Sequence, residues 1–225
     1  MRLNPFIDKW LCSRRPVARQ QFFTASLTLA ALLCLPAALL TKSAPRQEPG
    51  AANEESAFAQ PAVNRSPLKQ PLRDPKIVVK KAKRRLLLFS AGKLVRTYRI
   101  GLGLSPSGDK VRAGDRRTPE GDFYIFTKND KSAFYLSLGL SYPNTAHAER
   151  GLRDGLITRA QYNAITGALR AKKTPLQNTH LGGDIYIHGN GSQSDWTWGC
   201  VALENEDIRE LFNAVSVGTP VVIEP

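Results

Sequence analysis

GGDIYIHGNGSQSDWTWGCVAL, residues 182–203, is the stretch around which the rest of the chain is organised. Its segment 184–187 alternates and is rich in β-branched and aromatic residues, which predicts a β-strand. His188 follows at the end of that strand, and a turn-rich loop then leads to Cys200. The sequence therefore predicts one imidazole and one thiol on either side of a short loop, twelve positions apart.

These residue types suit nucleophilic catalysis. A neutral imidazole within reach of a thiol can take its proton, and the thiolate is the nucleophile. Taken singly, a lone Cys is most often a small buried hydrophobe and a lone His a satisfied polar residue. Both, however, lie in Gly-rich turns at predicted strand ends, where scaffolds present reactive groups. We therefore predict that Cys200 is the nucleophile and His188 its base, with alkylation of the thiol persisting below the free-cysteine pKa of about 8.5.

Gly199 completes the predicted site. It has no side chain that could block a substrate carbonyl. It also allows the backbone N–H groups of Gly199 and Cys200 to point into one pocket, as an oxyanion site requires.

Two motifs, IHG (187–189) and GCVAL (199–203), resemble the signature of the YkuD-type L,D-transpeptidases, bacterial cell-wall enzymes also called the ErfK/YbiS/YcfS/YnhG family. A second block, GDRRTPEGDFYI (114–125), is similar to a segment that the family carries beside its catalytic cleft. The chain has Thr-Trp where the family places Ser-His before Gly-Cys, which resembles the branch that reads DWT-x-GC. The resemblance implies that Cys200 is the nucleophile, that His188 is general base and acid, and that Gly189 orients the imidazole through its backbone.

The resemblance also implies a fold and a reaction. The fold is mainly β with a few helices, the mixed β-sandwich of the L,D-transpeptidase type, over residues 76–225. The reaction is peptidoglycan L,D-transpeptidation: Cys200 attacks the carbonyl between an L-centre and a D-residue of a tetrapeptide stem, releases terminal D-Ala and passes the thioester to an amine. Tyr186, Trp198 and Arg117 are expected to contact the substrate, and no cofactor is expected.

Two other functions stay open. One is a cysteine hydrolase, an L,D-carboxypeptidase or amidase, of peptidoglycan peptide links. The other is a non-catalytic cell-wall-binding module in which the basic surface matters and the thiol does not. No metal site is predicted, because the three histidines form no ligand signature. Of these, His147 and His180 are interpreted as surface or loop residues.

Local patterns predict the other elements of the domain. Alternating segments predict strands, and a capping box of Thr158 with Gln161 begins a helix that runs to Lys172. A second helix is expected to follow Asn205 as its N-cap and to end before Gly218. Strands are expected at 76–80, 85–89, 94–100, 134–138, 184–187 and 221–223, and a further strand is expected to end at 125.

The chain before the domain divides into three segments. Residues 1–21 are basic and are expected to be cytoplasmic, and residues 22–40 are an uncharged apolar run of nineteen residues, long enough to cross a bilayer. Residues 41–75 are rich in Pro and Ala and are predicted to be a flexible linker. We expect a single-pass signal anchor in the inner membrane with the domain in the periplasm; a cleaved export signal is the alternative.

Charge and cysteine usage agree with this location. Residues 76–225 contain 22 Lys or Arg and 14 Asp or Glu, a net charge of +8. Such a surface suits an anionic partner, such as peptidoglycan stem carboxylates or lipid headgroups. No nucleic-acid-binding module is recognisable, which argues against that partner. Cys200 is the one cysteine of residues 41–225, and an unpaired thiol in an exported domain favours a chemical role.

Overall fold

The structure is a computed structural model and describes residues 66–225. The expected cytoplasmic segment, the apolar run at 22–40 and most of the expected linker lie outside the described residues. Among the helices of residues 66–225, none has the length and apolar character that crossing a membrane requires.

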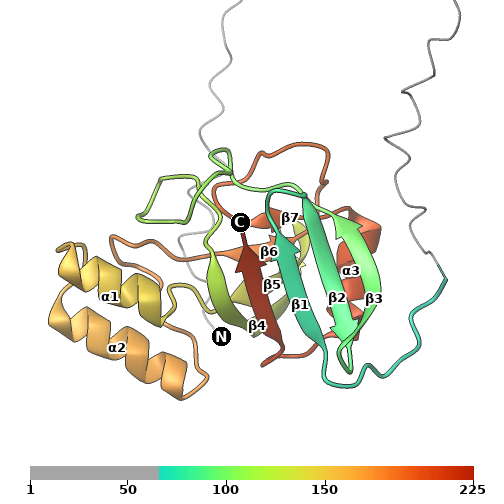
Figure 1. Cartoon of the computed structure of the whole chain (residues 1–225), viewed down its shortest axis with the longest axis horizontal. Coiled ribbons are helices and arrows are strands. Elements are labelled where there is room, and N and C mark those ends of the chain that lie inside the picture. Colours follow the sequence, from blue (N-terminus) through green and yellow to red (C-terminus); the bar gives the residue numbers. More distant parts are fainter. Residues whose placement is uncertain (1–65) are drawn as a thin grey trace, which may run out of the picture. The chain divides into compact units, whose positions relative to one another are not determined.

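The described chain folds into a mainly β domain with three helices (Figure 1). This confirms the mainly β character and the few helices of the predicted fold class, and most predicted strand limits agree with the observed ones to within a few residues. The strands are β1 (Lys76–Lys80), β2 (Arg85–Ser90), β3 (Lys93–Arg99), β4 (Gly121–Ser132), β5 (Tyr135–Leu140), β6 (Tyr186–His188), β7 (Val201–Ala202) and β8 (Pro220–Glu224). The helices are α1 (Thr145–Arg153), α2 (Arg159–Arg170) and α3 (Asn205–Ala214).

All eight strands belong to one mixed sheet in the order β3-β2-β1-β8-β4-β5-β6-β7. The pairs β1–β8 and β6–β7 are parallel and the other pairs are antiparallel. β4 pairs with β8 through residues 121–124 and with β5 from Ile125 onward, with an irregular register after Ile125. Where a sandwich was expected, the structure thus has one continuous sheet whose two halves share β4.

Alternation along the strands fills a single main core. In β1 and β2 the fully buried residues include Ile77, Val79, Leu86 and Leu88. α3 packs its apolar side, which includes Ile208, against the same cluster. Burying each aliphatic side chain of this size contributes about 1.5–3 kcal/mol, so the sheet and α3 form one stable support for the loops at their edge.

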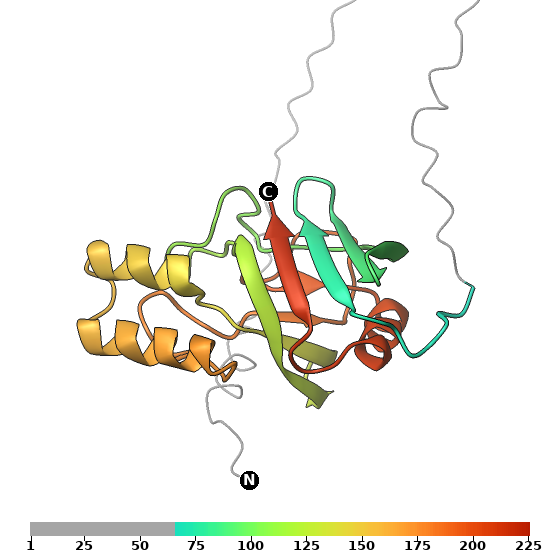
Figure 2. The same ribbon diagram turned by 60° about the horizontal axis from the view of Figure 1, so that its bottom comes forward.

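The helices α1 and α2 pack side by side at one side of the sheet, beyond β4 (Figures 1 and 2). The predicted capping box of α2 is confirmed, with Gln161 N 3.2 Å from Thr158 Oγ1 and Thr158 N 2.9 Å from Gln161 Oε1. The two helices share a small second core that includes Ala148, Ile157 and Ile165. α1 was not predicted, and it carries His147.

The end of the expected linker lies against the domain. Leu68 and Leu72 are half-buried and pack on the main core. The N–H of Ala91 donates to the carbonyl of Arg73 at 2.6 Å, and the Arg73 N–H donates to Ser90 Oγ at 2.9 Å. Residues 66–75 therefore contribute to the folded unit that holds the site.

Candidate active site

The parallel pair β6–β7 brings the predicted base and nucleophile to one edge of the sheet. Ile187 lies opposite Val201, and His188 lies opposite Ala202. Cys200 directly precedes β7 and lies beside Tyr186, whose N–H donates to its Sγ at 3.4 Å. The two motifs of the sequence therefore meet where β6 and β7 pair, with Sγ of Cys200 against the backbone of residues 184–186.

His188 is buried, with 3% of its surface exposed, and its tautomer follows from one hydrogen bond. Its Nδ1 lies 2.8 Å from the carbonyl oxygen of Gly189, the contact expected from the sequence. Because a carbonyl only accepts, Nδ1 carries the proton and Nε2 keeps its lone pair. The imidazole packs against the rings of Phe134 and Trp196, at centroid distances of 4.7 and 5.5 Å. Burial lowers the pKa of His188, partly offset by the bond to Gly189, so the ring is a neutral base.

The glycine after the histidine is required by close packing. A Cβ on Gly189 would lie 2.4 Å from Asn205 Oδ1 and 2.9 Å from the carbonyl oxygen of Phe134. Asn205 Oδ1 accepts from the N–H of Asn190 at 2.9 Å. The prediction that Asn205 caps α3 is wrong: the cap position is Glu204, and the Asn205 side chain instead holds the turn that follows His188.

The surroundings of Cys200 favour the protonated thiol. Burial raises its pKa to about 11, the Tyr186 N–H bond and Lys110 lower it, and Asp184 raises it. The S–H group faces the carbonyl oxygen of Asp184 at 3.5 Å. This direction runs against the expected alkylation below the free-cysteine pKa, because a neutral imidazole adds no positive charge that would offset burial, and the alkylation profile itself stays a prediction.

The turn before Cys200 separates the two predicted oxyanion donors. Gly199 has φ +128°, and its N–H donates to Thr197 Oγ1 at 3.1 Å. The Thr197 hydroxyl in turn donates to the carbonyl of Cys200 at 2.8 Å. The Gly199 N–H is thus an internal bond of the turn, and the N–H of Cys200 is the donor that we retain for an oxyanion.

The three residues expected to contact substrate lie in different environments. Tyr186 is half-buried and burial raises its pKa to about 12, so it stays a neutral phenol. Trp198 is 50% exposed beside the nucleophile. Arg117 is half-buried, and its Nη1 donates to the carbonyl of Asp109 at 3.4 Å. The preceding Arg116 instead lies over the Trp198 ring, 4.6 Å from its centroid, a placement for which the sequence held no local signal.

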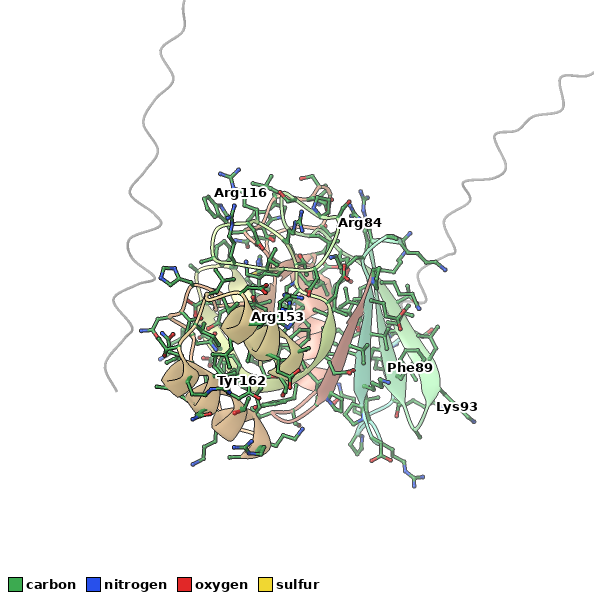
Figure 3. All side chains as sticks on the ribbon, turned by 60° about the vertical axis from the view of Figure 1, so that its left-hand side comes forward. Arg84, Phe89, Lys93, Arg116, Arg153 and Tyr162 are labelled. Carbon is green, nitrogen blue, oxygen red and sulfur yellow. The ribbon has the colours of Figure 1, made fainter. Side chains whose placement is uncertain are left out.

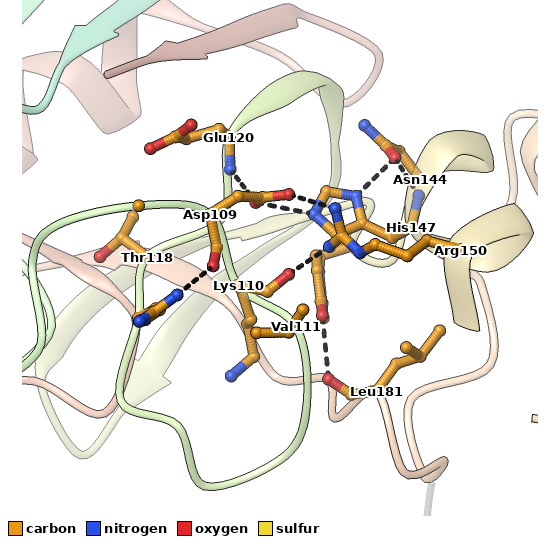
Figure 4. A network of polar contacts seen from close by, with 12 residues as sticks. Asp109, Lys110, Val111, Thr118, Glu120, Asn144, His147, Arg150 and Leu181 are labelled. Atoms are coloured by element: carbon orange, nitrogen blue, oxygen red, sulfur yellow. Dashed lines mark hydrogen bonds and ion pairs between the residues drawn. The ribbon is translucent and has the colours of Figure 1, made fainter. Parts of the chain in front are cut away.

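A buried polar network holds the loop between β3 and β4 in place (Figure 4). Asp109 accepts from the N–H of Glu120 at 2.8 Å and from Arg150 Nη1 at 2.8 Å, and it lies 3.0 Å from His147 Nε2. Burial alone would raise the pKa of Asp109, but His147, Glu120 and Arg150 hold it well below its usual range. The interpretation of His147 as a surface or loop residue is wrong, since it is buried on α1 within this network.

The same loop is tied down beside the thiol. Lys110 is buried, and its Nζ donates to Asp115 Oδ1 at 2.7 Å. Asp115 also accepts from the N–H groups of Val111 and Arg117, at 2.7 and 3.1 Å. His180 is exposed in the segment before β6, as the sequence predicts. Across residues 66–225, no three His, Cys, Asp or Glu side chains gather in a way that could hold a metal ion.

The fold and the site together define a mixed-sheet domain with an oriented imidazole and a thiol at the ends of two parallel strands. Residues 74–223 match the YkuD family of L,D-transpeptidase catalytic domains. The chain belongs to this family, whose members act on peptidoglycan peptides.

Similar solved structures include an L,D-transpeptidase from Xylanimonas cellulosilytica DSM 15894, with 17% identity over 71% of this chain and 64% of that one and a TM-score of 0.41. The helical cell shape determining protein Pgp2 from Campylobacter jejuni has 22% identity over 70% and 52%, with a TM-score of 0.45. Bd1075 from Bdellovibrio bacteriovorus has 23% identity over 68% and 48%, with a TM-score of 0.42. The chain thus spans about half to two thirds of these structures. No curated protein matches it.

Proposed function

We propose that this protein is a peptidoglycan L,D-transpeptidase that acts through a cysteine thioester on tetrapeptide stems. Membership of the family supports this reaction class. The observation that carries the proposal is the hydrogen bond from His188 Nδ1 to the Gly189 carbonyl, because it leaves Nε2 as the basic nitrogen of a residue on β6, the strand that pairs with β7 directly after Cys200.

The reaction begins from a neutral pair. As Sγ of Cys200 attacks the carbonyl between the L-centre and the terminal D-residue, the thiol proton passes to Nε2 of His188. The N–H of Cys200 stabilises the negative charge that develops on the carbonyl oxygen. The C–N bond then breaks, His188 returns the proton to the departing amine, and D-Ala leaves.

The second half of the reaction uses the same groups. An amine acceptor attacks the thioester carbonyl and His188 takes a proton from it. The C–S bond breaks and the proton returns to Sγ, which restores the thiol of Cys200. Since burial raises the pKa of the thiol, proton transfer accompanies the attack rather than preceding it.

The proposed location places the domain next to its substrate. Residues 22–40 anchor the chain in the inner membrane, and the basic domain faces peptidoglycan in the periplasm. Lys and Arg outnumber Asp and Glu by 22 to 14 in residues 76–225, which favours anionic stem peptides as partners.

Product analysis tests the proposal. The full chain, purified in detergent, is incubated with disaccharide tetrapeptides, and the products are separated and weighed by mass spectrometry. Cross-linked dimers with loss of D-Ala support the transpeptidase, whereas tripeptide products alone would make the protein a hydrolase. Unchanged peptide would leave only a wall-binding module. Cys200→Ala serves as the control, since Ala at this position costs little packing and should preserve the fold.

A further inference from the structure

Arg116 lies beside the turn that carries the candidate nucleophile, and within residues 66–225 it has no carboxylate partner. Its guanidinium carbon stands 4.6 Å from the centroid of the Trp198 ring, and Trp198 is two positions before Cys200. Both side chains are exposed, and Figure 3 shows Arg116 at the outer surface of the domain. None of the ion pairs within residues 66–225 includes Arg116.

The backbone of Arg116 is fixed in an uncommon conformation. Its φ of +58° lies in the left-handed region, which residues with a side chain rarely adopt. Its carbonyl accepts from the N–H of Ser105 at 3.1 Å. A Cβ on Gly103 would lie 2.1 Å from that carbonyl oxygen and 3.2 Å from the Cα of Gly199. The backbone of Arg116 is thus packed beside the turn that presents the nucleophile.

Backbone strain beside a reactive group is a reason to look for a functional constraint. The neighbours of Arg116 are held by the protein itself: Asp115 pairs with Lys110, and the Arg117 guanidinium donates to the 109 carbonyl. The Arg116 guanidinium, by contrast, stacks on the Trp198 ring. A cation on an aromatic face keeps its guanidinium edge available for hydrogen bonds while the ring limits its motion.

We propose that Arg116 determines substrate specificity by binding the terminal α-carboxylate of the stem peptide, an inference that rests on the proposed function. In that reaction the attacked carbonyl belongs to the bond that joins the stem to its last residue. The terminal carboxylate therefore lies one residue beyond the attacked carbon, and an extended chain spans about 3.3–3.6 Å per residue. A guanidinium two positions from Cys200 suits that short distance, and its fork can bind a carboxylate through two N–H groups.

Two peptides and three variants test this assignment. The peptides are a tetrapeptide with a free terminal carboxylate and the same tetrapeptide with a terminal carboxamide, and the readout is kcat/KM for release of the last residue. We expect the wild type to prefer the acid about tenfold or more, the range of a charge-assisted hydrogen bond. Arg116→Gln should lose that preference through a higher KM for the acid and leave the amide unchanged.

Two further variants serve as controls. Arg116→Lys keeps the charge but loses the fork, so it should give an intermediate preference. Arg112→Gln removes another exposed cation from the same loop and should behave as the wild type. Thermal unfolding of each variant checks that the fold is kept, as expected for exposed side chains.

The possible results separate this inference from the proposed function. If the wild type and Arg116→Gln release the last residue equally from both peptides, Arg116 has no such role while the proposed reaction stands. A second result would also overturn the assignment. The kcat/KM difference between the wild type and Arg116→Gln would then disappear when a side-chain carboxylate of the stem is amidated, and not when the terminal carboxylate is. A wild type that leaves both peptides intact would overturn the proposed function and this inference together.

Discussion

Arg84 and Asp195 form a two-point ion pair that fastens the loop before the nucleophile to the turn between β1 and β2. Arg84 Nε lies 3.0 Å from Asp195 Oδ1, and Nη2 lies 2.7 Å from Oδ2. Asp195 Oδ1 also accepts from the N–H of Leu102 at 2.9 Å. The Asp195 carboxylate thus connects three segments that are distant in the sequence: its own loop, the turn at Arg84 and the backbone at Leu102.

Asp195→Ala is expected to reduce stability and turnover together. The change removes a charged hydrogen-bond network and leaves the Leu102 N–H without its partner, which costs about 1–3 kcal/mol. Chemical denaturation and peptide turnover measure both effects, and a double-mutant cycle with Arg84→Ala isolates the ion pair.

The matched control for this change is Asp154→Ala. Asp154 pairs with Arg153, and the two side chains are 42% and 71% exposed. An exposed pair of this kind contributes about 0–1 kcal/mol. Equal losses from Asp195→Ala and Asp154→Ala would show that the Asp195 network does not hold the loop.

Gly199→Ala should disrupt the site through the backbone. A Cβ at this position would lie 2.7 Å from the carbonyl oxygen of Arg117, and φ is +128°, which strains any residue with a side chain. We expect a loss of about 1–3 kcal/mol in stability and a larger fall in turnover. Gly167→Ala in α2 is the control: its Cβ would meet nothing within 4 Å, and the change should stabilise the protein by about 0.5–1 kcal/mol. An active, stable Gly199→Ala protein would contradict the packing argument.

The pH dependence of thiol alkylation should follow the raised pKa of Cys200. A free cysteine has a pKa of about 8.5. Because the pKa of Cys200 is raised to about 11, its alkylation rate should keep rising well above that pH. His188→Gln should abolish turnover but change this profile little, because the imidazole is neutral. Exposed His180→Ala should change neither. Fast alkylation near pH 6 that disappears in His188→Gln would instead indicate a thiolate–imidazolium pair.

Turnover should have an acid limb set by His188. Its pKa lies below the usual value of about 6.5, so the base stays neutral and kcat/KM stays high until the pH falls below that value. The apparent pKa values obtained from the pH profile of kcat/KM belong to the His188–Cys200 pair rather than to either residue alone.

Asp109→Asn is expected to destabilise the domain in a pH-dependent way. The pKa of Asp109 is lowered in the folded state, so its contribution is present above the unfolded value of about 3.9 and is lost as the pH falls through the folded value. The difference in unfolding free energy between wild type and variant should therefore be largest near pH 7 and shrink in acid. Asp130→Asn, an exposed position outside this network, is the control variant.

The anchor is tested by fractionation. Because residues 22–40 are apolar and long enough to span a bilayer, the full chain should stay in the membrane fraction after a salt wash. A variant without residues 1–40 should not. A mature N-terminus downstream of residue 40, found by protein sequencing, would show that the segment is a cleaved export signal.

The elements that the sequence predicted are those with agreeing local signals. β2 is a short apolar run (LLLF) followed by a turn, and α2 begins with a capping box, so both were located within a few residues. α1 does not begin with a capping box. It is stabilised by distant contacts instead, such as the close approach of Leu181 to Gly151, where a Cβ would lie 2.7 Å from Leu181 Cδ2.

The candidate site divides in the same way. His188, Gly189 and Cys200 could be located because their motifs lie on two neighbouring strands. The high pKa of the thiol could not be predicted, because it results from burial by other parts of the chain. The position of the Arg116 side chain could not be predicted either, because it depends on the φ angle of Arg116 and on packing against Trp198.

The position of β8 has a consequence for how the protein is made. β8 lies between β1 and β4 in the sheet, and Lys80 and Glu224, which face each other in that pairing, are 144 residues apart. The ribosome therefore delivers the central strand after all the others, and the facing edges of β1 and β4 stay unpaired until then. A growing chain is expected to expose these edges to chaperones and to other chains throughout synthesis. We therefore expect the thiol site on β6 and β7 to become fixed relative to β1–β3 only after β8 has joined the two halves of the sheet.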